Sequence, residues 1–443
     1  MSFRKFFDRS AKPAPSAEPE AVEPEQDDSD ETFDGEPEAP PEHADAVDWR
    51  ARAAHVLPTG ASTGSKRPAA LYGSEDAVGP THFSGAVGCR VFDIDGNEFI
   101  DCTMALGSVA LGYAEPTVTR AVIEAASNGN VSGLSDAREV ELAERLCEVV
   151  PCAEMVQFLK TGAEATSAAV RLARTYTGRD VVIGCGYFGW HDWSSTAAGV
   201  PAGTTASYRT VPFDDIPALE AAVAAAGKQL AAIIIEPVIE RMPLPHWATR
   251  ARELCDAAGA ALIFDEIKTG FRLAPGGYQE HSKITPDLAA FGKAMANGYP
   301  LSAVVGKRAL MEAARNTWIS STLASESTAL AAAGAVLDWH EKADICDSLA
   351  SIGLELRESM NAVIKASGVT GVTIDGIDHM WLFRFDTPAR QQRFLELAAG
   401  QGVLFKRGAY NFPAIAHHDD IIQRIEAAAN AAFIDLREED ASS

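Results

Sequence analysis

Ala261-Leu-Ile-Phe-Asp265 is a short apolar run that ends in a carboxylate, and Leu288-Ala-Ala-Phe-Gly-Lys293 is a second run that ends in an amine. Each run has the length and composition of a buried strand. In open α/β sheets, ligands bind outside the carboxyl ends of the parallel strands. We therefore take Asp265 and Lys293 as the candidate reactive pair. A solvated lysine after Gly292 is the alternative.

The chain between residues 105 and 310 alternates short apolar runs with Ala-rich helical segments. This alternation predicts an α/β fold in which β-α crossover units surround one mostly parallel sheet of seven strands. The expected helices include residues 163–175, 216–226 and 247–258. The expected strands are residues 155–160, 181–184, 209–213, 231–236, 261–265, 288–292 and 301–305.

The flanking sequence predicts smaller elements. Residues 89–93 and 98–101 flank Asp95-Gly96 and are typical of a β-hairpin. After Arg308 a long helical stretch, several strand-like segments and a last helix predict a smaller α+β domain. The helical stretch spans residues 323–365, the strands are residues 369–374, 380–385 and 402–405, and the last helix spans about 418–436.

We expect four parts along the chain. An acidic N-terminal arm occupies residues 1–47, and residues 48–104 contribute to the small domain and to an active-site loop. Residues 105–310 form the large domain, and residues 311–443 form the C-terminal small domain.

The cysteines indicate a reducing compartment. The chain has 443 residues and seven scattered cysteines, without a Cys-x-x-Cys pair. An odd, scattered set predicts neither a disulfide framework nor a zinc site. We therefore expect a cytoplasmic protein that holds no metal.

The charge of the chain is strongly negative, at −24. This charge argues against nucleic-acid binding, which needs clustered Lys and Arg. Thirteen of the acids lie in residues 11–47 against one lysine, Lys12, so we expect this arm to be disordered. Residues 1–9 form a frayed terminus or, alternatively, a docking peptide for an unidentified protein or a membrane surface. The sequence contains no run of 18 apolar residues, so we expect no membrane-spanning segment.

Residues 157–192 predict a site for a phosphate and a ring. The backbone amides of Gly162 and Ala163 stand at an expected helix N-terminus, where a phosphate binds. The rings of Tyr187 or Phe188 are placed to lie flat on a ligand. Pyridoxal phosphate needs an amine for a Schiff base and a carboxylate for its pyridinium nitrogen. Lys293 and Asp265 supply these two groups.

Five segments carry a resemblance to a known family: residues 161–166, 187–192, 236–237, 264–272 and 291–298. They resemble motifs of class III pyridoxal-phosphate-dependent aminotransferases, in the branch that contains glutamate-1-semialdehyde 2,1-aminomutase. The resemblance extends from about residue 50 to 436. It implies fold type I and a homodimer that shares its active sites.

The resemblance implies a transaminase that moves an amino group from an amino donor to a carbonyl acceptor. An intramolecular aminomutase of the glutamate-1-semialdehyde type is the alternative. A non-catalytic interaction protein on the same fold, with the acidic arm recruiting partners, is a remote second alternative.

The resemblance also implies roles for single residues. Lys293 forms the Schiff base and moves a proton between the substrate carbon and C4′ of the cofactor. Asp265 keeps the pyridinium nitrogen protonated, although an Asp at this position is also a common helix N-cap. Ile267 and Tyr187 pack on the two ring faces, or alternatively belong to the core. Glu236 lines the pocket, or alternatively forms a strand-end salt bridge.

The remaining candidates bind phosphate or carboxylate groups. Thr322 resembles a family position that reaches the phosphate of the neighbouring subunit, with a helix N-cap as the alternative. Lys66, Arg67 and Arg407 are candidate partners for a substrate carboxylate. The alternative is that their side chains are solvated surface charges.

Three departures from the family pattern alter the site. Ala163 replaces a hydroxyl residue, so Thr161, Thr322 and the backbone amides must hold the phosphate. Phe188 replaces a His, which makes the pocket more apolar. Ser325-Glu326-Ser327 replaces Gly-Asn-Pro and places a carboxylate near the expected dimer contact.

Overall fold

The computed structural model describes residues 48–442. The predicted acidic arm, residues 1–47, and the predicted docking peptide within it lie outside this range. No helix in the described part of the chain is long and apolar enough to cross a membrane.

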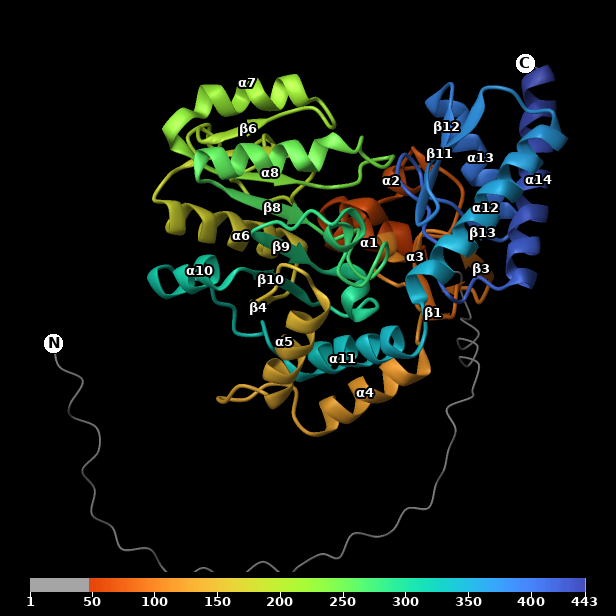
Figure 1. Cartoon of the computed structure of the whole chain (residues 1–443). Coiled ribbons are helices and arrows are strands. Elements are labelled where there is room, and N and C mark those ends of the chain that lie inside the picture. Colours follow the sequence, from red (N-terminus) through yellow and green to blue (C-terminus); the bar gives the residue numbers. More distant parts are fainter. Residues whose placement is uncertain (1–47, 443) are drawn as a thin grey trace, which may run out of the picture. The chain divides into compact units, whose positions relative to one another are not determined.

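A seven-stranded sheet forms the centre of the α/β region, as the sequence predicts (Figure 1). Its strand order is β4-β10-β9-β8-β7-β5-β6. β10 runs antiparallel to both of its neighbours, and the remaining pairs are parallel. The strands are β4 (Met155–Leu159), β5 (Val181–Cys185), β6 (Tyr208–Thr210), β7 (Leu230–Ile235), β8 (Ala261–Asp265), β9 (Leu288–Phe291) and β10 (Ser302–Gly306).

The central strands are apolar along their whole length because helices cover both faces of the sheet. All residues of β7, β8 and β9 are buried. Alternate residues such as Ile233 and Ile234 join two different apolar clusters, one on each face. α6 (Gly162–Thr177) covers one face, and α7 (Ile216–Ala226) and α8 (His246–Ala258) cover the other (Figure 1).

A four-stranded sheet joins the two ends of the described chain. The predicted hairpin is present as β2 (Arg90–Asp93) and β3 (Glu98–Asp101), and β1 (Phe83–Val87) extends it. β13 (Val403–Leu404) pairs in parallel with β3. This pairing ties residues from the N-terminal segment to the C-terminal part of the chain.

The C-terminal part differs in detail from the prediction. The expected single helical stretch is two helices, α11 (Ser327–Lys342) and α12 (Ile345–Ser367), because Asp344 caps a new helix. β11 (Val372–Ile377) begins three residues later than expected and pairs with β12 (Met380–Phe385). α13 (Pro388–Gly400) and α14 (Asp419–Ser442) complete this part.

The sequence reasoning missed two helices that cover α11. These helices are α4 (Pro116–Ser127) and α5 (Ala137–Val149), and both pack against α11 (Figure 1). The shorter helices are α1 (Trp49–Val56), α2 (Pro68–Tyr72), α3 (Met104–Gly107), α9 (Tyr278–Ser282) and α10 (Arg308–Met311), with 3₁₀ turns at Pro58–Gly60, Gly64–Lys66, Gly227–Gln229, Lys293–Ala296 and Glu312–Asn316.

Candidate active site

Asp265 and Lys293 stand at the ends of two neighbouring strands. Asp265 is the last residue of β8 and pairs with Ala290 of the parallel strand β9, and Lys293 follows β9 after Gly292. Asp265 is buried, and its Oδ1 accepts a hydrogen bond of 3.1 Å from the Ile267 amide. The residues after Asp265 form a turn rather than a helix, so the alternative of a helix N-cap is wrong.

The charges around Lys293 act in opposite directions on its amine. Burial lowers the pKa of Lys293, and the positive charge of Lys268 lowers it further. The carboxylates of Asp265 and Glu236 oppose this shift, and the net direction is downward. Burial, and then the negative charge of Glu236, raises the pKa of Asp265.

The start of α6 offers free backbone donors. Thr161 caps this helix, and Glu164 completes a capping box that occupies the amides of Lys160 and Thr161. Among residues 48–442 the amides of Gly162 and Ala163 have no hydrogen-bond acceptor. They carry the positive end of the helix dipole and suit a phosphate.

Ile267 comes close to this phosphate turn because residue 162 is glycine. A Cβ atom at Gly162 would lie 2.6 Å from the Ile267 Cδ1. On the other side, a Cβ atom at Gly189 would lie 2.4 Å from the Cβ of Ala163. The Gly189 contact requires glycine, because its φ is +94° and the neighbouring atoms belong to the Cα and Cβ of Ala163. At Gly162 the contact is with the end of the Ile267 side chain, so glycine there gives that side chain room beside the turn.

The two aromatic candidates have different surroundings. Tyr187 is 74% exposed, and its amide donates a 3.1 Å hydrogen bond to the Glu236 Oε2. Phe188 is buried and stacks on Trp193, with the ring centroids 5.9 Å apart. The Tyr187 ring is therefore free to contact a ligand, whereas the Phe188 ring packs in the core. The role of either ring against a cofactor stays a prediction.

Glu236 forms a salt bridge at the end of its strand, which was the alternative predicted for this residue. Its partner is Lys268, three residues after Asp265. The Lys268 Nζ also lies 4.5 Å from the centroid of the Tyr410 ring. Burial lowers the pKa of Lys268, but Glu236 and Tyr410 outweigh it, so the net shift is upward.

Arg67 and Arg407 come from segments that pack together. The Lys406 Nζ donates a 3.2 Å hydrogen bond to the carbonyl oxygen of Ala70 in α2. A Cβ atom at Gly73 would lie 2.9 Å from the Arg407 Nε. The Nε atoms of Arg67 and Arg407 are both buried and have no partner among the described residues. Lys66, in contrast, is exposed.

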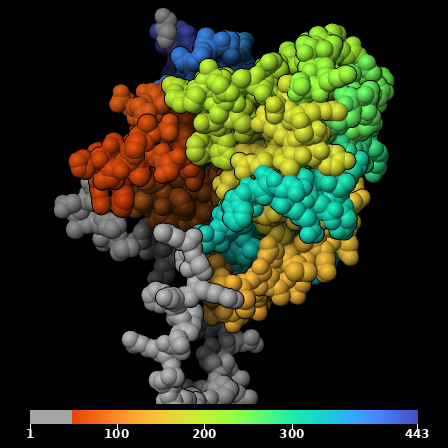
Figure 2. Space-filling view, turned by 90° about the vertical axis from the view of Figure 1, so that its left-hand side faces the viewer, coloured from red at the N-terminus to blue at the C-terminus, as the bar shows by residue number. Residues whose placement is uncertain are grey.

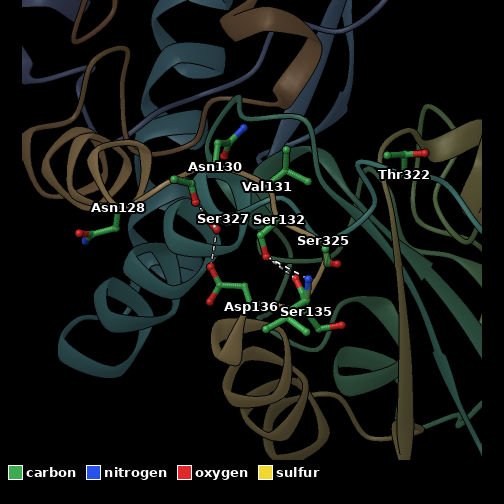
Figure 3. A pocket seen from close by; sticks show the side chains of 12 residues that line it. Asn128, Asn130, Val131, Ser132, Ser135, Asp136, Thr322, Ser325 and Ser327 are labelled. Atoms are coloured by element: carbon green, nitrogen blue, oxygen red, sulfur yellow. Dashed lines mark hydrogen bonds between the residues drawn. The ribbon is translucent and has the colours of Figure 1, made fainter. Parts of the chain in front are cut away.

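Thr322 lies in the loop that precedes α11. It is exposed and lines a polar pocket of about 380 Å³ with residues 128–136, Ser325 and Ser327 (Figure 3). Helix α11 begins at Ser327 with Glu326 as its cap, so the N-cap alternative for Thr322 is wrong. Within residues 48–442 no hydrogen bond joins Thr322 to the first turn of α6.

The donor groups of this site fit pyridoxal phosphate. The amine of Lys293, the buried carboxylate of Asp265 and the free amides of Gly162 and Ala163 match an aldehyde, a pyridine nitrogen and a phosphate. Among residues 48–442 no group of three His, Cys, Asp or Glu side chains is placed to hold a metal ion.

Comparison with known proteins agrees with this fit. The pattern of the family "Aminotransferase class-III" matches residues 73–189 and 190–424. The chain belongs to the class III aminotransferases. It is a pyridoxal phosphate-dependent transaminase, and the resemblance drawn from the sequence motifs is confirmed.

Two relatives of this class III aminotransferase are named for different substrates. A 3-aminobutyryl-CoA aminotransferase of Cloacimonas acidaminovorans is 37% identical over 71% of this chain and 78% of its own length. A glutamate-1-semialdehyde 2,1-aminomutase 2 of Brevibacillus brevis is 33% identical over 86% of this chain and 96% of its own length.

A solved structure supports fold type I and the cofactor. The PLP internal aldimine form of the FumI protein from Sphingopyxis sp. MTA144 superposes with a TM-score of 0.84. It is 28% identical and covers 89% of this chain and 97% of its own.

The sequence reasoning missed Lys268 and Tyr410 of this aminotransferase. Lys268 lies inside the 264–272 motif, and its spacing from Asp265 was the available signal. Tyr410 comes from a distant loop, and only tertiary packing brings it to Lys268.

Glu326 links the phosphate turn to the loop that carries Thr322. It is buried, its Oε1 pairs with the Lys160 Nζ at 2.8 Å, and it accepts hydrogen bonds from the amides of Thr328 and Ala329. Burial raises the pKa of Glu326, but Lys160 and Thr328 outweigh it and lower the pKa overall.

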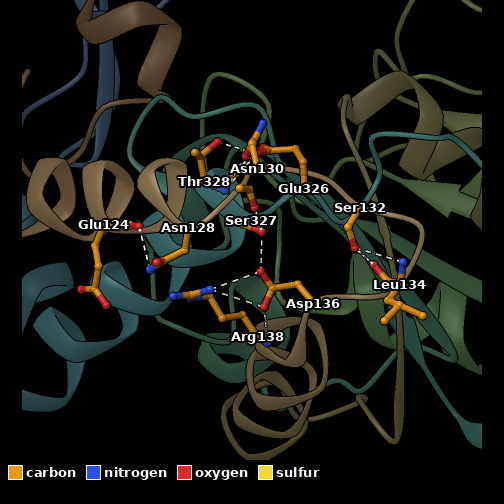
Figure 4. A network of polar contacts seen from close by, with 12 residues as sticks. Glu124, Asn128, Asn130, Ser132, Leu134, Asp136, Arg138, Glu326, Ser327 and Thr328 are labelled. Carbon is orange, nitrogen blue, oxygen red and sulfur yellow. Dashed lines mark hydrogen bonds and ion pairs between the residues drawn. The ribbon is translucent and has the colours of Figure 1, made fainter. Parts of the chain in front are cut away.

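Neighbouring bonds fasten the 128–136 segment to the same helix start. Ser327 donates a hydrogen bond to Asp136, and Asn130 Oδ1 accepts a 3.0 Å hydrogen bond from the Thr328 amide (Figure 4). The carboxylate that departs from the family pattern is thus part of a network that orders the rim of the pocket.

We expect Glu326→Gln to lower the free energy of unfolding by about 1–3 kcal/mol at pH 7, because it removes a charged partner from Lys160. The folded pKa lies below the unfolded value, so this contribution is present above about pH 4.3 and is lost as the pH falls through the folded pKa. Denaturant titrations at fixed protein concentration from pH 3 to pH 8 measure the difference. The exposed Glu144→Gln is the control. Equal stability of Glu326→Gln and the wild type at pH 7 would contradict the assignment.

Proposed function

We propose that Lys293 is the catalytic amine of this transaminase and that Asp265 is its partner at the cofactor nitrogen. The placement of both groups at the ends of the adjacent parallel strands β8 and β9 supports this proposal. When bound, pyridoxal phosphate supplies an electron sink for the bond broken at the substrate carbon.

Lys293 acts as a base only while its amine is neutral. An ordinary lysine has a pKa of about 10.4 and is almost fully protonated at pH 7. Burial and the charge of Lys268 lower the pKa of Lys293, so a larger fraction of the amine is neutral. With the cofactor bound, the neutral Nζ would take the proton from the substrate carbon and would donate it again when the amino group is transferred.

Asp265 holds a proton on the pyridine nitrogen of the cofactor, so that the ring accepts electrons. This role requires an ionised Asp265. A protonated ring nitrogen beside Asp265 supplies the positive charge that favours its ionised form. Ile267 and Tyr187 are proposed to contact the two ring faces, with Phe188 supporting the pocket from the core and Glu236 lining it.

The proposed phosphate ligands come from two subunits. The amides of Gly162 and Ala163 and the hydroxyl of Thr161 belong to one subunit, and Thr322 belongs to the second. This division is supported by the exposure of Thr322, which makes no hydrogen bond to the first turn of α6 within residues 48–442.

We also propose a homodimer. Large apolar side chains are exposed in three segments of the chain: Val131 and Leu134 line the polar pocket, Trp318 and Leu323 lie in the segment that carries Thr322, and Tyr187 and Trp190 lie in the loop after β5; all six are 50–84% exposed. Figure 2 shows the teal segment around residues 310–330 lying on the surface between α6 and the 115–145 region. A second copy that covers this face would bury these side chains and bring its Thr322 to the site.

Arg67, Arg407 and Lys66 are proposed to bind a substrate carboxylate. The buried, unpaired Nε atoms of the two arginines support this assignment. We infer a substrate with a carboxylate and an apolar or sugar-like body. The similarity to an aminomutase over 96% of its length keeps an intramolecular amino shift as the second candidate function.

The four-part division of the chain is also a proposal. The seven-stranded sheet lies wholly within residues 105–310, which supports a large domain there. Pairing of β3 with β13 supports a contribution of residues 48–104 to the C-terminal small domain. The seven cysteines are all free thiols, which supports a reducing cytoplasm.

We expect Lys293→Ala to lack the visible absorption band of the lysine-bound cofactor and to lose transaminase activity. The test is an absorbance titration of the holoenzyme with a panel of amino donors. Conversion of the band by one donor, with release of a carbonyl product, identifies a transaminase and its donor. Lys228→Ala, an exposed lysine, is the control and keeps the band.

A band that persists in Lys293→Ala would contradict the assignment of Lys293. A wild-type band that no donor converts, together with isomerisation of an amino-aldehyde without a second substrate, would move the function to an aminomutase.

We expect Arg407→Ala and Arg67→Ala to raise the KM for a carboxylate substrate roughly 10-fold or more, because each removes a charge-assisted hydrogen bond. The effect of Lys66→Ala is smaller, since its side chain is exposed. Steady-state kinetics with acidic and uncharged amines separate charge recognition from general damage. An unchanged KM in all three variants would rule out these residues as the carboxylate site.

We expect the wild type to sediment at about 94 kDa, twice the chain mass of 47.0 kDa. Leu134→Asp places a charge on the proposed interface and should shift the protein toward monomers with weaker cofactor binding. Leu354→Asp, on the exposed side of α12, is the control. A wild-type protein that stays monomeric at micromolar concentration would refute the shared site.

A further inference from the structure

Lys268 carries a fixed positive charge beside the reactive amine. It pairs with Glu236, and both side chains are largely buried, at 14% and 12% exposure. Its Nζ lies 4.5 Å from the centre of the Tyr410 ring, a favourable position for a cation. Both contacts favour the charged form, so Lys268 stays protonated.

The partners of Lys268 are themselves held in place. The Tyr410 hydroxyl accepts a 2.7 Å hydrogen bond from the Glu240 amide. The Glu236 Oε2 accepts a hydrogen bond from the Tyr187 amide. The ammonium group therefore has a defined position and is not a mobile surface charge.

Four charged groups act on Lys293 from the ends of two neighbouring strands, β7 and β8. Glu236 follows β7, Asp265 ends β8, and Lys268 and Arg272 lie in the segment after β8. Two are acids and two are cations. Without Lys268, Arg272 would be the remaining cation among these four groups. The carboxylates of Glu236 and Asp265, which favour the protonated amine of Lys293, would then be less opposed.

Arg272 is a weaker influence on Lys293 than Lys268 is. Its guanidinium is buried and donates hydrogen bonds to the carbonyl oxygens of Gly107, His379 and Pro413. These contacts bind it to other parts of the chain. Lys268, by contrast, belongs to the same ion-pair cluster as Glu236.

We propose that Lys268 is a positioning residue of this transaminase: held by Glu236 and Tyr410, its charge increases the neutral fraction of the Lys293 amine and the ionised fraction of the Asp265 carboxyl group. The inference rests on the proposed function of Lys293. A positive charge disfavours a second ammonium and favours a carboxylate, so a single group promotes both required states. In a buried site this influence is stronger than in water.

The test measures cofactor capture by the apoenzyme rather than turnover. Apoenzyme is mixed with pyridoxal phosphate from pH 6 to pH 10, and the rate at which the visible band forms is recorded. Because only the neutral amine reacts, the midpoint of this pH profile reports the pKa of Lys293. Lys268→Met should raise the midpoint by about one unit, which makes capture roughly tenfold slower at pH 7.

Three matched variants separate charge from shape. Lys268→Arg keeps the charge and should keep the wild-type midpoint. Glu236→Gln removes an opposing carboxylate and should shift the midpoint downward. The double variant Lys268→Met/Glu236→Gln should fall between Lys268→Met and the wild type. Thermal unfolding of each variant checks that it is folded, and the Glu236→Gln shift provides a test if Lys268→Met does not fold.

An unchanged midpoint in folded Lys268→Met would overturn the inference. A midpoint in Lys268→Arg equal to that in Lys268→Met would also overturn it, because shape rather than charge would then decide. Lys293→Ala separates a failure of the role proposed for Lys293 from a failure of the role proposed for Lys268. If it still forms the band, the proposed role of Lys293 fails; if it forms none while Lys268→Met is unchanged, only the role of Lys268 fails.

Discussion

Parallel pairing of β7, β8 and β9 is the constraint on which the site depends. The register places Ile235 opposite Phe264 and Asp265 opposite Ala290, so the three strands end at one edge of the sheet. Backbone hydrogen bonds between the strands set this register, and the register determines where the side chains lie. Glu236, Asp265 and Lys293 are therefore brought together by strand register, although nearly 60 residues separate the first from the last.

The same burial that makes the strands stable makes their polar ends reactive. A charged group surrounded by apolar residues changes its pKa or finds a partner. Lys293 and Asp265 are shifted in opposite directions by burial. Glu236 and Lys268 instead pair with each other, and this pairing raises the pKa of Lys268. The site thus holds two residues that we propose to be reactive, Lys293 and Asp265, beside one ion pair, Glu236 and Lys268.

Glycine permits the close packing on which the phosphate turn depends. Gly162 allows Ile267 to approach the start of α6, and Gly189 allows the next loop to pack on Ala163. On the opposite side, the Lys160–Glu326 pair joins this turn to the loop with Thr322. Glu326 is the carboxylate that departs from the family pattern. It caps α11 and pairs with Lys160, and these contacts compensate for its burial.

The sequence by itself determined the seven strands of the large sheet and indicated Lys293 and Asp265 as the candidate pair at the ends of two of them. It did so because strand burial on two faces leaves continuous apolar runs, and reactive groups at their ends stand out against them. The tertiary structure alone decided that Glu236 pairs with Lys268, that Tyr410 covers this lysine and that Phe188 packs in the core. These contacts join segments far apart in the chain, and their pairing depends on three-dimensional packing that no local sequence pattern records.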